Sequence, residues 1–250
     1  MNILITGASS GIGAALAREY ARRGDSLFLC GRDAARTAEV AESCRTLGAP
    51  RAEAEVLDVA DVEATRAWIA RCDAAAPLDI VHANAGVSTG VEDEENVRRT
   101  FAVNVGGVLN TVLPAIDAFR KAEVSRIRKQ IVITASIAGY RGLPPAPSYS
   151  ATKACVKAWG AGLRGMLKPE GIRVNVVCPG FVRSRITDKN TCPMPFFWEA
   201  DKAARVIVSR VLRDVPLIAF PWPMRLGAWL GACLPERLAS LLYDHLPDKC

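Results

Sequence analysis

The chain has 250 residues, of which 50% are hydrophobic and 23% charged, and its formal net charge is +6 at pH 7. This composition is that of a globular chain with a sizeable core, and it excludes disorder as a description of the whole sequence. The eight Cys form no C-x-x-C pair and the two His are far apart, so no metal site is indicated, and we expect reduced thiols in the cytoplasm.

Strands and helices are predicted to alternate along the chain. Strands are predicted at 2–6, 26–30, 53–57, 78–83, 130–135, 172–178 and 216–220. Helices are predicted at 12–23, 34–47, 61–75, 93–121 (broken near Asn104), 149–168, 199–213 and 235–245. The strands are continuous apolar runs, which are typical of strands buried on both faces. We therefore expect one α/β domain over 1–250, with a Rossmann-like doubly wound parallel sheet of about seven strands and helices on both faces.

The ends of these elements carry further signals. Asp33 and Asp61 occupy positions where N-caps belong, and Gly24 follows the first helix as a C-cap candidate. No charged segment followed by an apolar run opens the chain, so no secretory signal is expected. The apolar stretch 226–234 is too short to span a bilayer, so we expect no transmembrane helix.

A glycine turn joins the first expected strand to the first helix, in the sequence Thr6-Gly7-Ala8-Ser9-Ser10-Gly11-Ile12-Gly13. Glycine allows close backbone approaches that a Cβ would block, and the free N–H groups of a helix N-terminus attract a phosphate. At the start of a parallel α/β chain this arrangement predicts a dinucleotide site. The spacing G-x-x-x-G-x-G differs from the commoner G-x-G-x-x-G, and the P-loop Lys is absent.

Tyr149 and Lys153 are four residues apart on an expected helix, so they share one face. A free phenol has a pKa near 10 and is a poor acid/base group at neutral pH. A nearby ammonium favours the phenolate, which would bring the pKa closer to working pH. The pair is therefore a candidate acid/base device for carbonyl chemistry.

Ser136 ends the expected strand 130–135, and ligands of open α/β sheets bind beyond the carboxyl ends of strands. A hydroxyl there can hold a substrate oxygen beside the phenol and stabilise developing charge. Asn104 is a polar amide in an apolar helical stretch, where it needs hydrogen-bond partners.

Six motifs occur in the order and at the spacing of one family: Thr6-Gly7-x-x-x-Gly11-x-Gly13, Asn84-Ala85-Gly86, Asn104, Ser136, Tyr149-x-x-x-Lys153 and Pro179-Gly180. Over residues 2–220 the chain resembles the short-chain dehydrogenase/reductase family, in its compact subclass. The resemblance implies a nicotinamide-dependent oxidoreductase that interconverts a carbonyl and an alcohol on a small molecule and forms a homo-oligomer. It implies a catalytic set of Asn104, Ser136, Tyr149 and Lys153, with Asn104 at a helix break and supporting a water that relays protons to Lys153.

The resemblance also implies a cofactor site. Its residues are Gly7, Ser9, Ser10, Gly11, Ile12, Gly13, Arg32, Asp58, Val59, Asn84, Ala85, Gly86, Tyr149, Lys153, Pro179, Gly180, Val182 and Ser184. Asp58 stands at the position of the adenine-contacting acid, and Ser184 where many relatives have Thr. Ala83 departs from the family, which more often has Asn there.

The choice of nicotinamide cofactor depends on the end of the second strand. Gly31 stands where NAD-preferring relatives carry Asp, so no carboxylate repels a 2′-phosphate there, and Arg32 can pair with one. We therefore expect NADP(H) in preference to NAD(H). The alternative is that Asp33 holds the ribose instead of capping the next helix.

Two segments depart from the family pattern or extend it. Residues 221–250 form an atypical apolar extension, expected either as two small helices packed on the body or as a contact with a subunit or membrane surface. Met194, Pro195, Phe196, Phe197 and Trp198 are expected to cover a rather hydrophobic substrate.

Other readings of the chain stay open. The basic residues Arg120, Lys121, Arg126, Arg128 and Lys129 lack interleaved aromatics, so we interpret them as a solvated edge and expect no nucleic-acid partner. His82 and His245 are interpreted as structural. The functional alternatives are a non-catalytic NADP(H)-binding regulator and a sugar-nucleotide-modifying relative, although the latter usually has a larger C-terminal domain.

Overall fold

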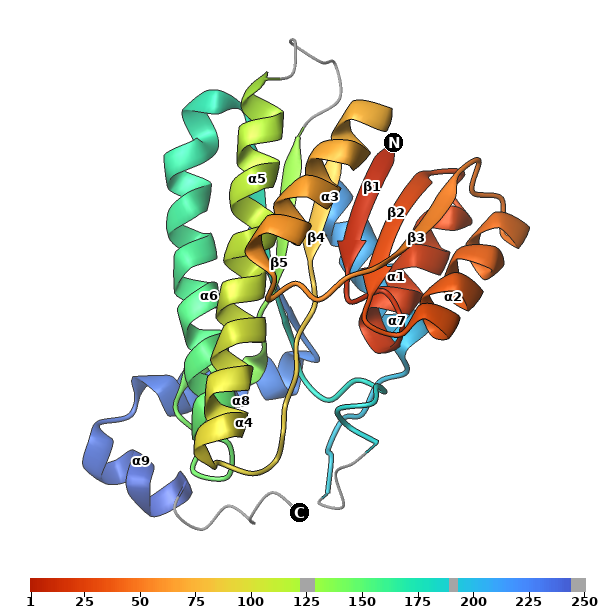
Figure 1. Ribbon diagram of the computed structural model, residues 1–250. Helices are drawn as coiled ribbons and strands as arrows, with labels where there is room; N and C mark the ends of the chain where they lie inside the picture. Colours follow the sequence, from red (N-terminus) through yellow and green to blue (C-terminus); the bar gives the residue numbers. More distant parts are fainter. Residues whose placement is uncertain (122–128, 189–192, 244–250) are drawn as a thin grey trace.

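The computed structural model describes residues 1–121, 129–188 and 193–243, arranged as one α/β unit (Figure 1). Arg126, Arg128 and His245, which the sequence analysis singled out, lie outside these residues, as does the last part of the apolar extension.

Seven parallel strands form one sheet in the order β3-β2-β1-β4-β5-β6-β7. The strands are β1 (Asn2–Thr6), β2 (Ser26–Gly31), β3 (Ala52–Val56), β4 (Ile80–Ala83), β5 (Gln130–Thr134), β6 (Arg173–Pro179) and β7 (Leu217–Phe220). The strand order reverses at β1, which pairs in parallel with β2 on one side and with β4 on the other. This doubly wound order, which the sequence predicts, opens a crevice beyond the carboxyl ends of β1 and β4.

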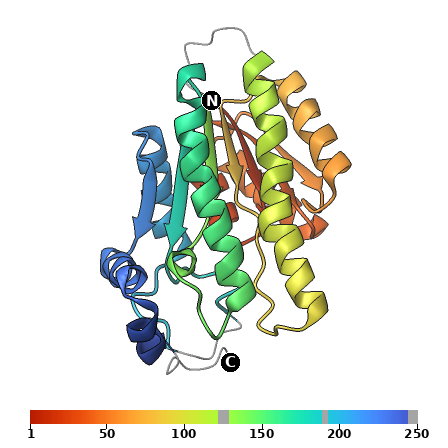
Figure 2. The same ribbon diagram turned by 90° about the vertical axis from the view of Figure 1, so that its left-hand side faces the viewer.

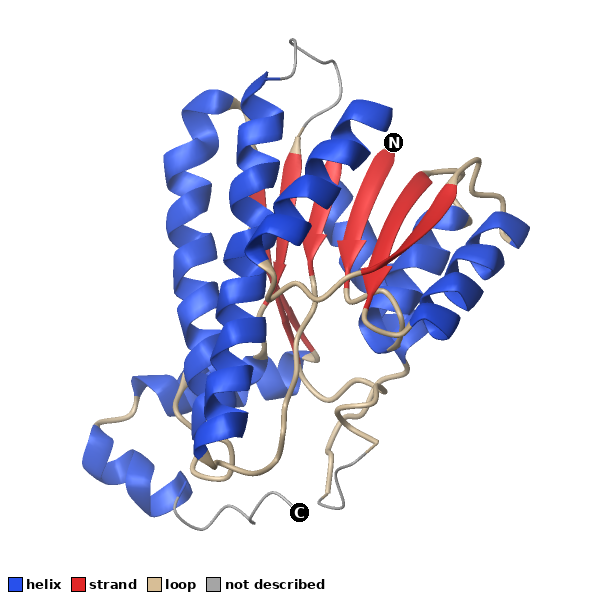
Figure 3. Ribbon diagram, viewed as in Figure 1, coloured by secondary structure: helices blue, strands red, loops and turns tan. Residues whose placement is uncertain are grey.

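Helices cover both faces of the sheet (Figures 1 and 3). They are α1 (Gly11–Ala21), α2 (Ala34–Thr46), α3 (Val62–Ala75), α4 (Glu94–Phe101), α5 (Gly107–Lys121), α6 (Pro147–Leu167), α7 (Ala200–Leu212), α8 (Trp222–Cys233) and α9 (Glu236–Tyr243). One core cluster joins the sheet to α1, α2 and α7, and the other joins it to α3, α5 and α6. Strands buried between two such layers are continuous apolar runs, as the sequence indicates.

Local signals fix several element boundaries. Asp33 and Asp61 cap α2 and α3, because their carboxylates accept hydrogen bonds from the backbone N–H groups of Arg36 and Ala64, each at 3.0 Å. Gly24 adopts a φ of +75° just beyond α1, a left-handed conformation that glycine reaches without a Cβ penalty. The two caps are therefore as predicted, whereas the C-cap of α1 is Arg22 and Gly24 lies two residues beyond it.

Two elements differ from the sequence-based expectation. β3 alternates Ala and Glu because it is an edge strand with one side toward solvent. α8 has no range among the helices predicted in chain order, although two small helices are one expectation for the extension 221–250, and α8 and α9 are two such helices. In the structure Pro221 precedes the helix as its N-cap and Pro223 lies in the first turn, where a missing N–H costs nothing.

One continuous helical stretch, Glu94–Lys121, is long and apolar enough to cross a membrane by length and composition alone. In the fold it is formed by α4, a π-helical segment at Ala102–Gly106 and α5, and it packs against α3, α6 and β4 (Figure 2). Its apolar face therefore belongs to the core of this domain.

A buried polar pair ties α1 to the sheet. The Tyr20 hydroxyl lies 2.9 Å from His82 Nε2, and both side chains are fully buried. Burial lowers the pKa of His82 from 6.5 to about 3, so the imidazole is neutral in the folded protein at neutral pH.

This burial makes folding sensitive to acid. The unfolded chain binds a proton at His82 below about pH 6.5, whereas the folded chain does so only near pH 3, so stability is lost as the pH falls between these values. We expect the free energy of unfolding to fall by up to about 1.4 kcal/mol per pH unit from this group. Urea unfolding of the parent and of His82→Gln, repeated between pH 7 and about pH 4, gives the free energy of unfolding as a function of pH. We expect this free energy to fall less steeply with falling pH in the variant. Equal slopes would contradict the assignment.

Candidate active site

A cleft of about 840 Å³ lies at the carboxyl ends of the central strands. It is lined by the glycine turn, by the ends of β2, β4, β5 and β6, and by parts of α4 and α6. All the residues predicted to contact the cofactor line this cleft, as do Ser136, Tyr149 and Lys153. The structure thus brings together motifs spread over residues 7–184.

The glycine turn is held against the end of β4 without room for side chains. A Cβ on Gly13 would overlap the Gly7 carbonyl oxygen and lie 2.7 Å from Asn84 Nδ2. Gly7 has a φ of +68°, and its Cβ would meet Ala85 Cα at 2.7 Å. Glycine is therefore required at both positions.

Hydrogen bonds of Thr6 also hold the glycine turn against the end of β4. The Thr6 hydroxyl donates to the His82 carbonyl at 3.2 Å and accepts from the backbone N–H of Asn84 at 3.0 Å. Ser10 supplies no side-chain cap to α1. The first-turn N–H groups of α1 consequently face the cleft without a capping side chain, which suits the phosphates of a dinucleotide.

Tyr149 and Lys153 both lie on α6, as their spacing predicts, but the phenol and the ammonium are not directly paired. Lys153 Nζ lies 5.8 Å from the Tyr149 ring centroid and donates a hydrogen bond to the Thr134 carbonyl at 2.9 Å. Burial lowers the pKa of Lys153 to about 8. Burial also raises the pKa of Tyr149, and a hydrogen bond with Ser136 partly offsets this rise. Ser136, which the sequence places only near the substrate oxygen, is thus also the group that favours the phenolate here.

Ser136 begins the short 3₁₀ helix Ile137–Tyr140 at the end of β5. Its hydroxyl accepts from the backbone N–H of Ala138 at 3.1 Å and lies 3.5 Å from the Pro179 carbonyl oxygen of the neighbouring strand. These contacts hold the hydroxyl beside the Tyr149 phenol at the mouth of the cleft.

Asn104 lies behind the cleft wall and not in its lining. The helix break predicted at this residue is the π-helical segment Ala102–Gly106. The buried amide accepts from the Val87 N–H at 2.8 Å and donates to the Val87 carbonyl at 3.0 Å and to the Thr152 hydroxyl at 3.1 Å. A Cβ on Gly86 would lie 3.3 Å from both Asn104 Oδ1 and Lys153 Nζ, so the three residues converge. The relay role of Asn104 stays a prediction.

At the adenosine end two arginines and two acids face the cleft. Arg32 lies 3.8 Å from Asp58, and Arg36 lies 2.8 Å from Asp33, the cap of α2. Arg36 Nε is buried and has no hydrogen-bond partner among the described residues. From the sequence the 2′-phosphate contact is expected at Arg32, with Ser9, Ser10 or the neighbouring Arg36 as the alternatives, and Arg36 lies in the first turn of α2. The orphaned guanidinium N–H and the two cations fit a phosphate at this end.

The predicted apolar cover is not part of the cleft lining. Trp198 stacks on Phe220 with ring centroids 5.0 Å apart, and the Arg183 guanidinium lies 5.5 Å from the centre of the Phe197 ring. The part of the chain that follows β6 more closely contributes Arg185, Ile186 and Thr187 to the cleft lining instead. The described residues contain no cluster of three or more His, Cys, Asp or Glu side chains suited to a metal ion.

The comparisons with known proteins show the family of the chain. The short chain dehydrogenase family model matches residues 1–193. An uncharacterized oxidoreductase of Myxococcus xanthus is 36% identical, with 98% of this chain and 94% of that protein covered. A Sphingobium yanoikuyae short-chain dehydrogenase in complex with NADPH matches with a TM-score of 0.80 at 28% identity, covering 100% of this chain and 98% of that chain.

A third relative differs in its cofactor. A 3-oxoacyl-(acyl-carrier protein) reductase of Brucella melitensis with bound NAD matches with a TM-score of 0.73 at 29% identity, covering 87% of this chain and 88% of that chain. The chain therefore belongs to the short-chain dehydrogenase/reductase family. It is an oxidoreductase with an NAD(P)-binding Rossmann fold.

The packing of the 3₁₀ helix on α6 yields a test of this geometry. A Cβ on Gly139 would lie 2.6 Å from the Lys153 carbonyl carbon, whereas nothing lies within 4 Å of a Cβ on Gly142. We expect Gly139→Ala to displace Ser136 or Lys153 and to lower kcat by about a hundredfold, while Gly142→Ala stays close to the parent. Steady-state kinetics with thermal unfolding as a folding control check this. Equal activity in the two variants would show that the contact does not position the site.

Proposed function

We propose that this protein uses NADP(H) to interconvert a carbonyl and an alcohol on a small molecule, with Tyr149 as the general acid/base. The observation that carries the proposal is the convergence of Ser136, Tyr149 and Lys153 beside a glycine turn that leaves helix N–H groups for a phosphate. When bound, the nicotinamide supplies or accepts the hydride. The protein supplies orientation, proton transfer and electrostatics.

In the reduction direction the Tyr149 phenol donates a proton to the substrate oxygen. Burial raises its pKa, so the phenol is protonated at neutral pH and ready to act as an acid. The Ser136 hydroxyl, a hydrogen-bond partner of that phenol, is placed to hold the same oxygen. As negative charge develops on the oxygen, both hydroxyls stabilise it in a site already arranged to receive it.

Lys153 supports the phenol at longer range. With a pKa of about 8 its side chain is mainly an ammonium at pH 7, and the positive charge favours the phenolate that remains after proton transfer. Its hydrogen bond to the Thr134 carbonyl holds the amine in the cleft lining. Asn104 makes three hydrogen bonds beside Gly86, two of them to the backbone of Val87. It would hold this backbone in place and so support the predicted proton relay to Lys153.

The preference for NADP(H) rests on Arg32 and Arg36. Both line the adenosine end of the cleft, and Arg36 keeps one buried N–H unpaired among the described residues. Asp33, the alternative ribose acid, is engaged both as the cap of α2 and as the partner of Arg36. A hydrophobic substrate is not part of this proposal, because the aromatic residues expected to cover it pack outside the cleft lining. A homo-oligomeric state and a cytoplasmic location stay predictions.

Tyr149→Phe removes the acid/base group and leaves the ring in place. We expect turnover of carbonyl substrates to fall by at least about a hundredfold, while the dissociation constant of NADPH changes little, because the phenol is one of many cofactor contacts. Absorbance of NADPH with a carbonyl panel, and titration of NADPH fluorescence, measure the two quantities. Activity within about tenfold of the parent would rule out Tyr149 as proton donor. A parent that binds NADPH but turns over nothing would favour the non-catalytic regulator.

Arg32→Ala and Arg36→Ala each remove a cation from the 2′-phosphate site. The ratio of kcat/KM for NADPH over NADH should fall about ten- to a hundredfold in each, the range expected for one charge-assisted contact. Arg71→Ala is the control, because Arg71 is exposed and pairs with Glu55 outside the cleft lining. Removing these cations is cleaner than adding an acid at Gly31, where a Cβ would lie 2.9 Å from Ser9 Cβ. A parent that prefers NADH would overturn this assignment.

A further inference from the structure

Two arginines outside the predicted site line the cleft beyond the adenosine end. Arg99 lies in the last turn of α4, on the same face as Asn96 and Val103, which also line the cleft. Arg185 lies in the connection that follows β6, directly after Ser184. Both side chains belong to exposed residues, so each can reach a ligand from solvent.

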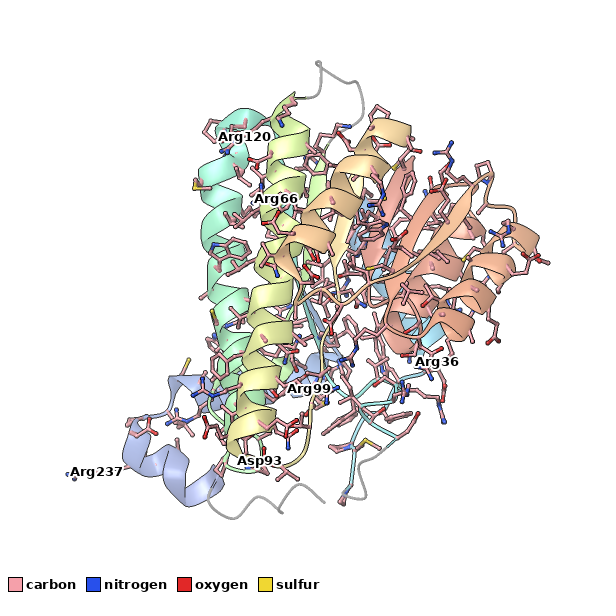
Figure 4. All side chains as sticks on the ribbon, viewed as in Figure 1. Arg36, Arg66, Asp93, Arg99, Arg120 and Arg237 are labelled. Atoms are coloured by element: carbon pink, nitrogen blue, oxygen red, sulfur yellow. The ribbon has the colours of Figure 1, made fainter. Side chains whose placement is uncertain are left out.

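The two residues lie on different walls of the cleft, Arg99 on α4 and Arg185 on the connection after β6. α4 packs against α6, the helix of Tyr149, and Glu92 just before α4 accepts a hydrogen bond from the Ser148 hydroxyl at 2.8 Å. In Figure 4 Arg99 extends from α4 on the side that faces the connection after β6. On that opposite wall, a Cβ on Gly11 would meet Ser184 Cβ at 2.8 Å, which places Arg185 next to the glycine turn.

Each of these arginines has a neighbour in sequence that is already paired. Arg98 binds Glu94 at 2.8 Å and Arg183 binds Glu199 at 2.8 Å, and neither Arg98 nor Arg183 lines the cleft. Within the described ranges no acidic side chain pairs with Arg99 or Arg185. Glu94 and Glu199 thus pair with arginines outside the cleft lining, and the guanidinium groups of Arg99 and Arg185 have no acidic partner among the described residues.

Acidic side chains occur at only one end of the described cleft lining. The acids in its described lining are Asp33 and Asp58, and both lie at the adenosine end beside Arg36 and Arg32. The remainder of the lining holds Lys153, Arg99 and Arg185 and no carboxylate among the described residues. Low-dielectric walls that carry charge of one sign raise the local concentration of the opposite ion. This end of the cleft therefore favours an anion.

We infer that Arg99 and Arg185 form a binding site for an acidic group, a carboxylate or a phosphate, on the substrate whose carbonyl lies at Tyr149. The inference rests on the proposed function, since it assigns the substrate class of that same cleft. A guanidinium presents paired N–H donors that match a carboxylate or phosphate in two-point contact, which a lysine would not supply. The substrate class is thus an oxo acid, or a carbonyl compound that carries a phosphate.

Kinetics with matched substrates test this assignment. Straight-chain oxo-carboxylates of increasing length are compared with their methyl esters, using NADPH and the variants Arg99→Gln and Arg185→Gln. We expect the parent to prefer the acid, and each variant to lower the acid-over-ester ratio of kcat/KM by about ten- to a hundredfold. Arg98→Gln and Arg183→Gln, the paired neighbours, should leave the ratio unchanged. A parent without preference for the acids, or variants that lower both series equally, would overturn the inference.

A binding measurement separates this inference from the proposed function and from the cofactor. Octanoate, hexyl phosphate and the neutral octanamide are titrated by calorimetry into parent and variants loaded with NADP⁺. Tighter binding of either anion than of the amide, lost in Arg99→Gln with an unchanged Kd for NADP⁺, supports the anion site even if no carbonyl is turned over. An equal loss of NADP⁺ affinity would assign the arginines to the cofactor pyrophosphate and overturn the inference, as would equal binding of anions and amide.

Discussion

The close approach of the β1 turn to the end of β4 is the constraint on which the rest of the site depends. Gly7, Gly13 and the backbone of Asn84 and Ala85 pack so tightly that a Cβ on either glycine would collide with protein. Thr6 fastens the same junction through hydrogen bonds to both sides of the β4 end. Because β1 and β4 flank the point where the sheet order reverses, fixing this junction fixes the crevice in which a dinucleotide lies.

The catalytic end is built by a second close approach, that of the 3₁₀ helix after β5 to α6. Gly139 lies against the backbone of Lys153, and the Lys153 amine reaches the Thr134 carbonyl at the end of β5. The strand end, the hydroxyl of Ser136 and the phenol of Tyr149 are consequently parts of one packed unit. For the mechanism proposed above this packing matters, because a general acid has to lie within hydrogen-bond reach of the substrate oxygen.

The sequence predicts the fold and most of the site lining because both depend on local signals. Buried strands, the caps Asp33 and Asp61, the glycine turn and the i, i+4 spacing of Tyr149 and Lys153 all require particular residues at particular positions. Contacts between distant segments cannot be read in this way. The partner of Lys153 is a strand-end carbonyl and not the phenol, and the aromatic side chains of Phe197 and Trp198 find partners outside the cleft. The two small helices expected in the extension are present as α8 and α9, and Pro is tolerated in the first turn of α8 although it breaks a helix in the interior.

Pairing of charges differs between the two ends of the cleft. At the adenosine end each acid in the lining has an arginine beside it, and these ion pairs hold the guanidinium groups in place without neutralising every N–H. At the catalytic end the arginines that pair with acids point away from the cleft, as Arg98 and Arg183 do, and those that line it carry net positive charge. In the functions proposed above, selection of the cofactor and of the substrate depends on different arginines, and none of them belongs to the backbone junction at Gly7 and Gly13.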